Sequence, residues 1–344
     1  MFTLSQLGTL WLERQPCAPY MKPMPAGSFP ILFISATRIG DAVLSSGLVR
    51  RLSEEIPNAS FTIVAGPAAA GLFNDLPGLK EIIVFEKARD GRHWFRLWRQ
   101  VRKTRWGLVV DMRGSALSGF LNRRRRAVFK RIPGPPVHKV VEAARVLNLE
   151  ADPPAPYIFT SPETEALAAD ITAGEGPILA LAPAANWVGK TWPLERFAQM
   201  AIRLVDQGGP LHGGRIMVLG GPEDAGAVSA LRHVVPKDRF IDLVGKVDLL
   251  TTHACLRHAR IFVGNDSGLM HMAAAAGAPT LGLFGPSDEA LYGPWGEKTR
   301  IVRGPRDYET ILAVDPGFQQ TMCHMMDLTV ETVVDAATRL LAES

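Results

Sequence analysis

The sequence predicts an α/β protein that consists of two Rossmann-like domains with parallel sheets facing a central cleft. Short β-branched runs alternate with stretches of helical periodicity from Pro30 onward. The Pro-rich stretch 151–156 and a second break at 174–177 divide this alternation into two series. The chain of 344 residues, 47% hydrophobic and 21% charged, is long enough for two domains, and its composition is not typical of disorder or of a coiled coil.

The first series begins with a strand at 31–36 and a helix at 42–55, in which Val43, Leu44 and Leu48 recur at helical spacing. The remaining elements of this series are predicted from the same alternation. They are strands at 61–65, 82–85 and 108–111 and a helix at 94–103. Short connections between such elements favour a parallel sheet that is covered by helices.

The second series repeats the pattern after the break at 174–177. Strands are predicted at 178–182, 215–219, 240–244, 261–263 and 280–284, and helices at 194–205, 224–233, 249–257 and 269–276. A last helix, at 329–344, is able to cross back to the first domain. We therefore predict an N-terminal domain at 29–160 and a C-terminal domain at 174–326.

The first 28 residues are predicted to be a poorly ordered extension, because five prolines between positions 16 and 30 prevent regular structure. Met21 and Met24 are alternatives to Met1 as the start of the protein. The weakly apolar stretch in this extension lacks the flanks of a signal peptide. Three cysteines that lie far apart, with no CxxC pair, fit a reducing compartment, so a cytoplasmic location is expected.

Charge is divided unevenly between the two halves of the chain. Residues 1–150 hold 23 Lys and Arg against 11 Asp and Glu, a balance of +12, whereas residues 151–344 hold 15 against 23, a balance of −8. A run of four arginines at 123–126 lies in the basic half. The first domain is therefore expected to face an anionic partner or an anionic membrane surface, although a solvated basic face is the simpler alternative.

Ligands of open parallel sheets bind beyond the carboxyl ends of the strands, so the loops that follow strands are the candidate sites. The first such loop is Arg38-Ile39-Gly40-Asp41. Gly40 allows another group to approach the backbone closely. Asp41 stands at the start of a helix, where it can cap the helix or act as a general base at the mouth of the cleft.

Two loops of the second domain carry the features of a phosphate and sugar site. The loop 183–193 places Lys190 just before a helix that begins with Pro193, so that amides, helix dipole and ammonium can hold a phosphate. The loop 264–271 contains Asp266, Ser267 and His271 at the start of a small-residue helix. Asp266 can accept hydrogen bonds from sugar hydroxyls, although capping by Asp266 or Ser267 is the simpler alternative.

Absent motifs narrow the class of protein. No GxGxxG follows the first strand, which removes the main support for a nicotinamide dehydrogenase, and neither HExxH nor GxSxG occurs. No Asp-x-Asp occurs either, so no metal and no cofactor are expected. The negative charge of a bound diphosphate would then be neutralised by Lys190, by helix dipoles and by Arg38.

Taken together, these loops resemble those of glycosyltransferase family 9, the ADP-heptose:lipopolysaccharide heptosyltransferases. The resemblance rests on three motifs, which are Ile39-Gly40-Asp41, Lys190-Thr191-Trp192-Pro193 and the stretch from Asn265 to His271, continued by Leu283 to Ser287. The last stretch is similar to the heptosyltransferase II branch. Thr191 stands where many members of the family carry a second basic residue.

The resemblance implies a GT-B fold, with the donor on the second domain and the acceptor on the first. It implies that Asp41 deprotonates the acceptor in an inverting, metal-independent transfer, with Arg38, Gly40 and Thr191 as weaker acceptor or phosphate contacts. The implied donor contacts are Lys190 with the phosphates, Glu223 with the ribose, Asp266 with heptose hydroxyls, the Ser267 and Gly268 amides with the diphosphate, and His271 as support of the loop. The implied partners are ADP-heptose, the lipid A-linked inner core of lipopolysaccharide and the cytoplasmic face of the inner membrane, with no nucleic acid.

Other functions stay open at this stage. A glycosyltransferase of the same fold can use another nucleotide sugar or acceptor, and a sugar-nucleotide epimerase shares the fold. A non-enzymatic protein that binds a membrane surface or nucleic acid is the remaining alternative, because Trp94, Phe95, Trp98 and Trp106 interleave the basic region. Trp94 and Trp98 are four residues apart on a predicted helix, which favours packing inward.

Overall fold

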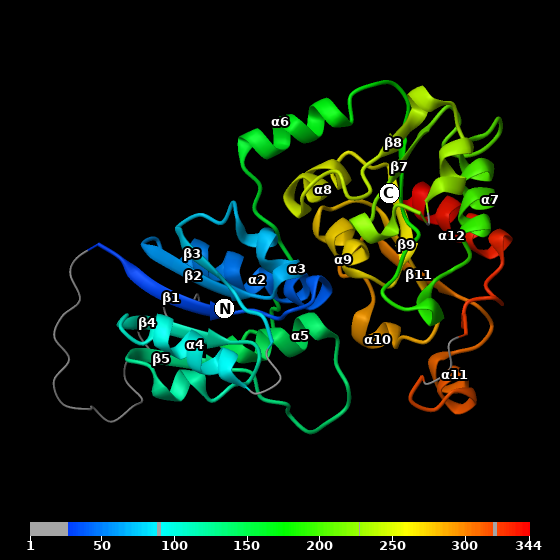
Figure 1. The fold of residues 1–344 in the computed structure, drawn as a ribbon. Coiled ribbons are helices and arrows are strands. Elements are labelled where there is room, and N and C mark those ends of the chain that lie inside the picture. Colours follow the sequence, from blue (N-terminus) through cyan, green and yellow to red (C-terminus); the bar gives the residue numbers. More distant parts are fainter. Residues whose placement is uncertain (1–26, 88–90, 227, 319–321) are drawn as a thin grey trace.

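The computed structural model describes residues 27–87, 91–226, 228–318 and 322–344. These residues form two parallel sheets that lie side by side, each covered by helices (Figure 1). The α/β class and the pair of Rossmann-like domains predicted from the sequence are confirmed. Most of the predicted extension 1–28 lies outside the described residues.

Five strands build the first sheet in the order β3-β2-β1-β4-β5. They are β1 (Phe29–Ile34), β2 (Ala59–Ala65), β3 (Leu79–Val84), β4 (Trp106–Asp111) and β5 (Arg123–Val128). The first domain also contains α2 (Ile39–Glu55), α3 (Pro67–Ala70), α4 (Arg92–Val101), α5 (Lys139–Ala144) and the short 3-10 helices η1 (Gly71–Phe73), η2 (Leu117–Phe120) and η3 (Arg145–Leu147).

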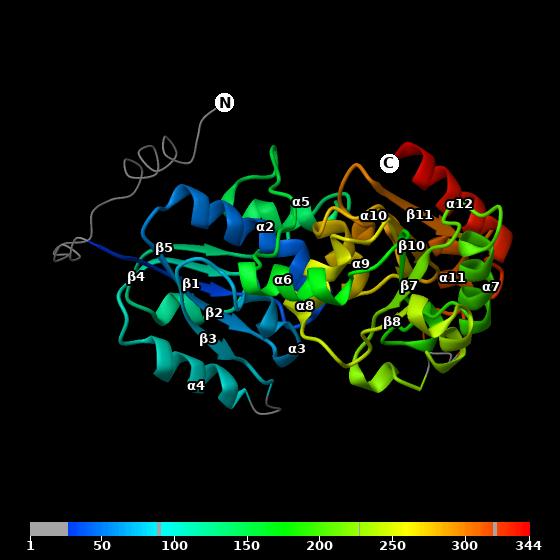
Figure 2. The ribbon, with the colours of Figure 1, turned by 90° about the horizontal axis from the view of Figure 1, so that it is seen from above.

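The central strand of this sheet is apolar on both faces because helices cover both. Ile31 and Phe33 pack into the core beneath α2, whereas Leu32 and Ile34 pack into a second core beneath α4. All four side chains are fully buried. A strand buried in this way needs a continuous apolar run rather than an alternating one. As a result, α2 and α5 lie on one side of the sheet and α4 on the other (Figure 2).

Six strands build the second sheet in the order β11-β10-β9-β6-β7-β8. They are β6 (Ile178–Ala182), β7 (Arg215–Val218), β8 (Phe240–Asp242), β9 (Ile261–Asn265), β10 (Thr280–Phe284) and β11 (Thr299–Arg303). Its helices are α7 (Leu194–Val205), α8 (Leu249–Leu256), α9 (Gly268–Ala275), α10 (Glu289–Tyr292), α11 (Tyr308–Val314) and α12 (Val330–Glu343), with 3-10 helices η4 (Val188–Lys190), η5 (Pro222–Asp224), η6 (Ser229–His233) and η7 (Lys237–Arg239).

The structure differs from the elements predicted by the sequence in several places. The edge strands β5 and β11 were not predicted, because an edge strand pairs on one side only and tolerates charged residues such as the arginines of β5. The helix expected at 224–233 is replaced by the short 3-10 helices η5 and η6.

The last helix, α12, packs against the second sheet and α7 rather than crossing back to the first domain, so that expectation is wrong. Its buried face, formed by Val333, Ala337 and Leu340, joins the core beneath β10 and β11. Ion pairing between Arg300 and Glu343, at 2.8 Å, holds its end to the same domain. Among the described helices, none combines the length and the apolarity that a membrane span needs.

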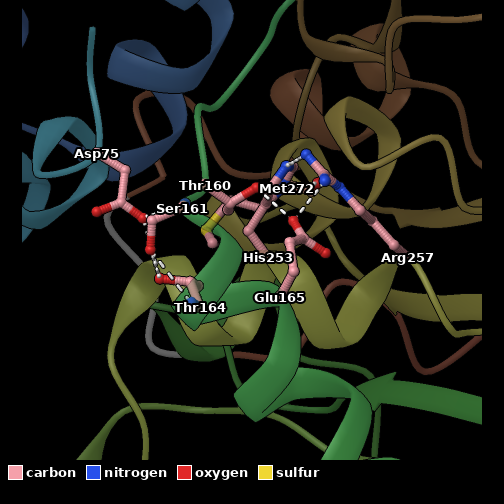
Figure 3. A network of polar contacts seen from close by, with 8 residues as sticks. All are labelled: Asp75, Thr160, Ser161, Thr164, Glu165, His253, Arg257 and Met272. Atoms are coloured by element: carbon pink, nitrogen blue, oxygen red, sulfur yellow. Dashed lines mark hydrogen bonds and ion pairs between the residues drawn. The ribbon is translucent and has the colours of Figure 1, made fainter.

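The helix α6 (Pro162–Ile171) joins the two domains and contacts both (Figure 3). On the first domain, the Asp75 carboxylate accepts hydrogen bonds from the Ser161 amide at 2.6 Å and from the Thr164 hydroxyl at 3.0 Å. On the second domain, Glu165 pairs with Arg257 of the α8 end at 2.5 Å. The start of α6 is therefore fixed to one domain and its body to the other, while the limits 29–160 and 174–326 stay predictions.

Arg257 also lies beside the ring of His253 in α8, at 3.5 Å. The other ring nitrogen of His253 lies 3.3 Å from the Met272 carbonyl of α9 (Figure 3). Burial lowers the pKa of His253 to about 3, so this ring is neutral in the folded protein near neutral pH.

Candidate active site

The two domains meet where α2 and α9 begin, at the carboxyl ends of β1 and β9. Gly40 and Gly268 make this approach possible. A Cβ atom on Gly268 would lie 2.8 Å from Ile39 Cγ2 and 3.2 Å from the Gly40 nitrogen, and one on Gly40 would lie 3.2 Å from His271 Cδ2. The loop after the first strand of one domain is thus in contact with the Asn265–His271 loop of the other.

Asp41 lies in the first turn of α2 and is half buried at this meeting point. Burial raises the pKa of its carboxyl group, and the nearby Asp266 raises it further, while Arg38, Lys139 and Lys190 lower it. The neighbours that act on Asp41 come from both domains. A half-buried carboxylate with a raised pKa at the meeting point of two domains is suited to accept a proton from a bound hydroxyl.

Three loops of the second domain converge on the Asp266 carboxylate. Lys190, at the end of η4, places its Nζ 2.6 Å from Asp266 Oδ2. The hydroxyl of Ser287, after β10, donates to the same oxygen at 2.6 Å. Asp266 follows β9 and only 7% of its side chain is exposed. An anion, a cation and a hydroxyl are thereby held together at the carboxyl edge of the second sheet.

Asn265, at the end of β9, fixes the loop that carries Lys190. Its side-chain amide donates to the Pro183 carbonyl at 2.7 Å, and its side-chain oxygen accepts from the Trp192 amide at 3.1 Å. Trp192 is fully buried, and its indole donates to the Leu328 carbonyl at 2.9 Å. Trp192 therefore packs in the core rather than lining the site.

The start of α9 presents two polar atoms that have no hydrogen-bond partner within the part of the chain that the structure describes. They are the hydroxyl oxygen of Ser267 and Nδ1 of His271. Burial lowers the pKa of His271 to about 4, with a smaller lowering by His138 and Lys190, so its ring is neutral near neutral pH. Buried polar atoms are normally paired, which makes this helix start a place where a ligand's polar groups fit.

Three of the predicted residues lie around this cluster rather than in it. Arg38 is exposed just before α2, yet close enough to act on the Asp41 carboxyl group. The hydroxyl of Thr191 is used by its own loop, where it donates to the Trp187 carbonyl at 3.1 Å. Glu223 is exposed in η5, at the end of β7, which lies two strands from β9 in the sheet.

The start of α5 carries two residues of the site that the sequence did not single out. His138 Nδ1 accepts from the Val140 amide at 3.2 Å, so Nε2 carries the proton and donates across to the Gly293 carbonyl at 2.9 Å. Lys139 pairs with Glu142 at 2.5 Å, and its Nζ lies 5.6 Å from the centre of the Tyr292 ring. The start of α5 follows β5, a strand that the sequence does not predict, so it does not stand among the loops after predicted strands.

A basic hollow opens on the first domain beside this cluster. Its volume is about 410 Å³, and it lies between β5, its following loop and η3. Arg126, Lys130 and Arg145 line it, together with Glu142, the partner of Lys139. The hollow is thus linked to Lys139 through Glu142, and its basic side chains favour an anionic group. Among the residues that the structure describes, no group of three or more His, Cys, Asp or Glu side chains is placed to hold a metal ion.

Two Rossmann-like domains that meet in this way, with a carboxylate on one and a Lys and an Asp on the other, form the GT-B fold. The model of glycosyltransferase family 9 (heptosyltransferase) matches residues 102–312, and the chain belongs to this family. The family predicted from the motifs is confirmed.

Several known proteins are similar over nearly the whole chain. Lipopolysaccharide heptosyltransferase 2 of Salmonella typhimurium is 24% identical, over 91% of this chain and 99% of its own. The solved structure of Escherichia coli ADP-heptose LPS heptosyltransferase II superposes with a TM-score of 0.71 at 20% identity, covering 92% of this chain and 99% of that one. A family 9 glycosyltransferase from Veillonella parvula gives a TM-score of 0.73 at 20% identity, covering 93% and 99%.

Proposed function

We propose that this protein transfers heptose from ADP-heptose to the lipid A-linked inner core of lipopolysaccharide, by an inverting reaction that needs no metal ion. Membership of family 9 and the similarity to lipopolysaccharide heptosyltransferase 2 and to ADP-heptose LPS heptosyltransferase II support the class of donor and acceptor. The observation that carries the proposal is the position of Asp41 where the two domains meet, close enough to Lys190 and Asp266 of the second domain that both act on the pKa of its carboxyl group.

The donor is proposed to bind at the start of α9. The helix dipole and the amides of Ser267 and Gly268 favour the diphosphate, and the Lys190 ammonium adds a positive charge. Lys190 has three N–H donors, so it can contact a phosphate while it keeps its pair with Asp266 at 2.6 Å. The remaining Asp266 oxygen is then available to heptose hydroxyls, and Glu223 to those of the ribose.

The reaction is proposed to be a single displacement at the anomeric carbon. Asp41 removes the proton of the acceptor hydroxyl, whose oxygen forms the new bond as the bond to the diphosphate breaks. ADP leaves with the electron pair, and its charge is stabilised by Lys190 and the α9 dipole. The acceptor attacks from the first domain while the diphosphate is held on the second, so the configuration at the anomeric carbon inverts.

The acceptor is proposed to bind on the first domain through its anionic groups. Phosphates and carboxylates of an inner core match the balance of +12 over residues 1–150 and the basic hollow lined by Arg126, Lys130 and Arg145. The acceptor is anchored in a bilayer, so we propose that the protein works at the cytoplasmic face of the inner membrane. Nucleic acid is not part of this proposal.

The test is transfer by the purified protein from ADP-heptose to inner-core acceptors with and without the first heptose, in the presence of EDTA, with products weighed by mass spectrometry. We expect a gain of one heptose on one of the two acceptors, and we expect Asp41→Asn to bind ADP normally but to lose at least about 100-fold in turnover. Full activity of Asp41→Asn would refute its role as base. Transfer only from another nucleotide sugar would show that ADP-heptose is not the donor.

A further inference from the structure

A second surface of the first domain combines exposed aromatic rings with positive charge. We name it the α4 patch, and it consists of the outer side of α4 with Phe120 of η2. Phe95 is 63% exposed and Phe120 73% exposed. Trp98 connects them, because its ring stacks on Phe95 with centroids 5.7 Å apart and its indole donates to the Phe120 carbonyl at 3.2 Å. The rings therefore form one surface across two elements.

The helix beneath the patch holds these rings outward. Leu97 and Val101 of α4 are buried in the core over Leu32 and Ile34 of β1. This packing fixes which side of α4 faces solvent. Phe95 therefore cannot turn into the core without moving the whole helix. A fixed group of exposed aromatic rings on a soluble domain usually marks a contact surface.

Positive charge surrounds the rings. Between 92 and 103 the chain carries five Lys and Arg and no Asp or Glu, and each of the five is exposed: Arg92, Arg96, Arg99, Arg102 and Lys103. Such a helix, with basic residues around outward apolar rings, has the composition of helices that lie in the plane of an anionic bilayer surface.

We propose that the α4 patch docks the protein on an anionic lipid bilayer, with Phe95 and Phe120 inserted among the headgroups. The inference rests on the proposed function for its biological reason, because a lipid-anchored acceptor is reached at a membrane. The patch lies on the side of the first sheet opposite α2 and α5 (Figure 2). Docking through it therefore leaves α2 and α5 clear of the contact, while the first domain, on which the acceptor is proposed to bind, is held at the bilayer.

A bilayer fits the patch better than single-stranded nucleic acid does. Binding of successive bases requires open ring faces. Here Trp106 is buried, Trp94 packs against Phe85 with centroids 4.7 Å apart, and the faces of Trp98 are shared with Phe95 and with the Arg102 guanidinium at 4.9 Å. The rings that are most exposed are phenylalanines, which have no polar atom to offer a base.

The test is flotation of the full-length protein with vesicles of phosphatidylglycerol and phosphatidylcholine, compared with vesicles of phosphatidylcholine alone. Arg96→Gln with Arg99→Gln should lower the partition coefficient on the anionic vesicles about 25-fold, since each charge near such a surface contributes about fivefold. Phe95→Ser with Phe120→Ser should lower it at least about tenfold. The matched control is Lys237→Gln with Arg339→Gln, which removes two exposed charges from the second domain and should leave binding unchanged.

Any of three results would overturn the inference. The first is that wild-type protein does not float with anionic vesicles, and the second is that both α4 variants float as well as wild type. The third is that a single-stranded oligonucleotide binds the patch more tightly than the vesicles do. Heptose transfer to a delipidated acceptor is measured in parallel and should be unchanged in the α4 variants, so a failure of the docking surface is distinguished from a failure of the proposed reaction.

Discussion

The close approach of Gly268 to the Ile39-Gly40 loop gives the sharpest test of the contact between the two domains. Replacement of Gly268 by Ala would place a Cβ atom 2.8 Å from Ile39 Cγ2 and 2.9 Å from Ile39 Cβ. These distances are about 0.7 Å short of those at which carbon atoms attract each other. Neither Ile39 atom is the far end of a flexible side chain, so the backbone of the Ile39-Gly40 loop must shift away from Gly268. Overpacking of this kind costs about 1–3 kcal/mol.

This free-energy cost should lower the activity of the enzyme rather than the stability of its fold. Gly268 and Ile39 belong to different domains, so the protein can relieve the contact by opening the cleft, which separates Asp41 from Asp266. Expressed as kcat/KM, about 1–3 kcal/mol is a loss of about 5–150-fold. The melting temperature and the affinity for ADP, which we propose that the second domain binds, should stay close to those of the wild type. Gly40→Ala, whose Cβ would lie 3.2 Å from His271 Cδ2, should lose less activity than Gly268→Ala.

The assay is steady-state heptose transfer, with ADP binding by calorimetry and melting by circular dichroism. Ile39→Gly removes both atoms that meet the new methyl group, so the double variant with Gly268→Ala should lose less than the two single variants added together. The reasoning is refuted if Gly268→Ala keeps wild-type kcat/KM. It is also refuted if the two losses simply add, or if ADP affinity falls as far as activity does.

Three further outcomes are expected. Lys190→Met leaves the nearly buried Asp266 without its cation and should weaken ADP binding by about 10–100-fold in calorimetry; unchanged affinity would remove Lys190 from the donor site. His253 and His271 are neutral in the fold, with pKa values lowered to about 3 and about 4, but protonate in the unfolded chain below about pH 6.5. The free energy of unfolding in urea should therefore fall as pH drops below 6.5, by about 1.4 kcal/mol per pH unit for each ring, and His253→Gln should reduce that slope; an equal slope would contradict this. Asp75→Ala leaves the Ser161 amide without its acceptor and should lower that free energy by about 1 kcal/mol, with Asp152→Ala, an exposed acid, as the unaffected control.

Much of the fold follows from local sequence because parallel α/β domains have strong local signals. The buried strands β6 and β10 are near-continuous apolar runs that helices must cover, and both were predicted with the bounds that the structure has. The loops after such strands gather at one edge of a sheet, which is why Lys190 and Asp266, 76 residues apart in the chain, were both candidates before their contact was known.

The arginine run of β5 shows where local signals fail. Four consecutive arginines are not typical of a strand. They are tolerated in β5 because it pairs with β4 along one edge only and leaves its outer side to solvent. Because the sequence does not predict β5, it also does not place the start of α5 after a strand, and His138 and Lys139 were not recognised as candidates.

What the sequence by itself determined is the alternation of strands and helices, the family, and the residues at the strand ends. The contact of Gly40 with the Asn265–His271 loop, the His138 bond to Gly293 and the packing of α12 on its own domain were decided only by the tertiary structure. The physical reason is that each depends on how elements that lie far apart in the sequence pack against one another. Local propensity and periodicity describe which face of an element is apolar, but not which distant surface will cover it.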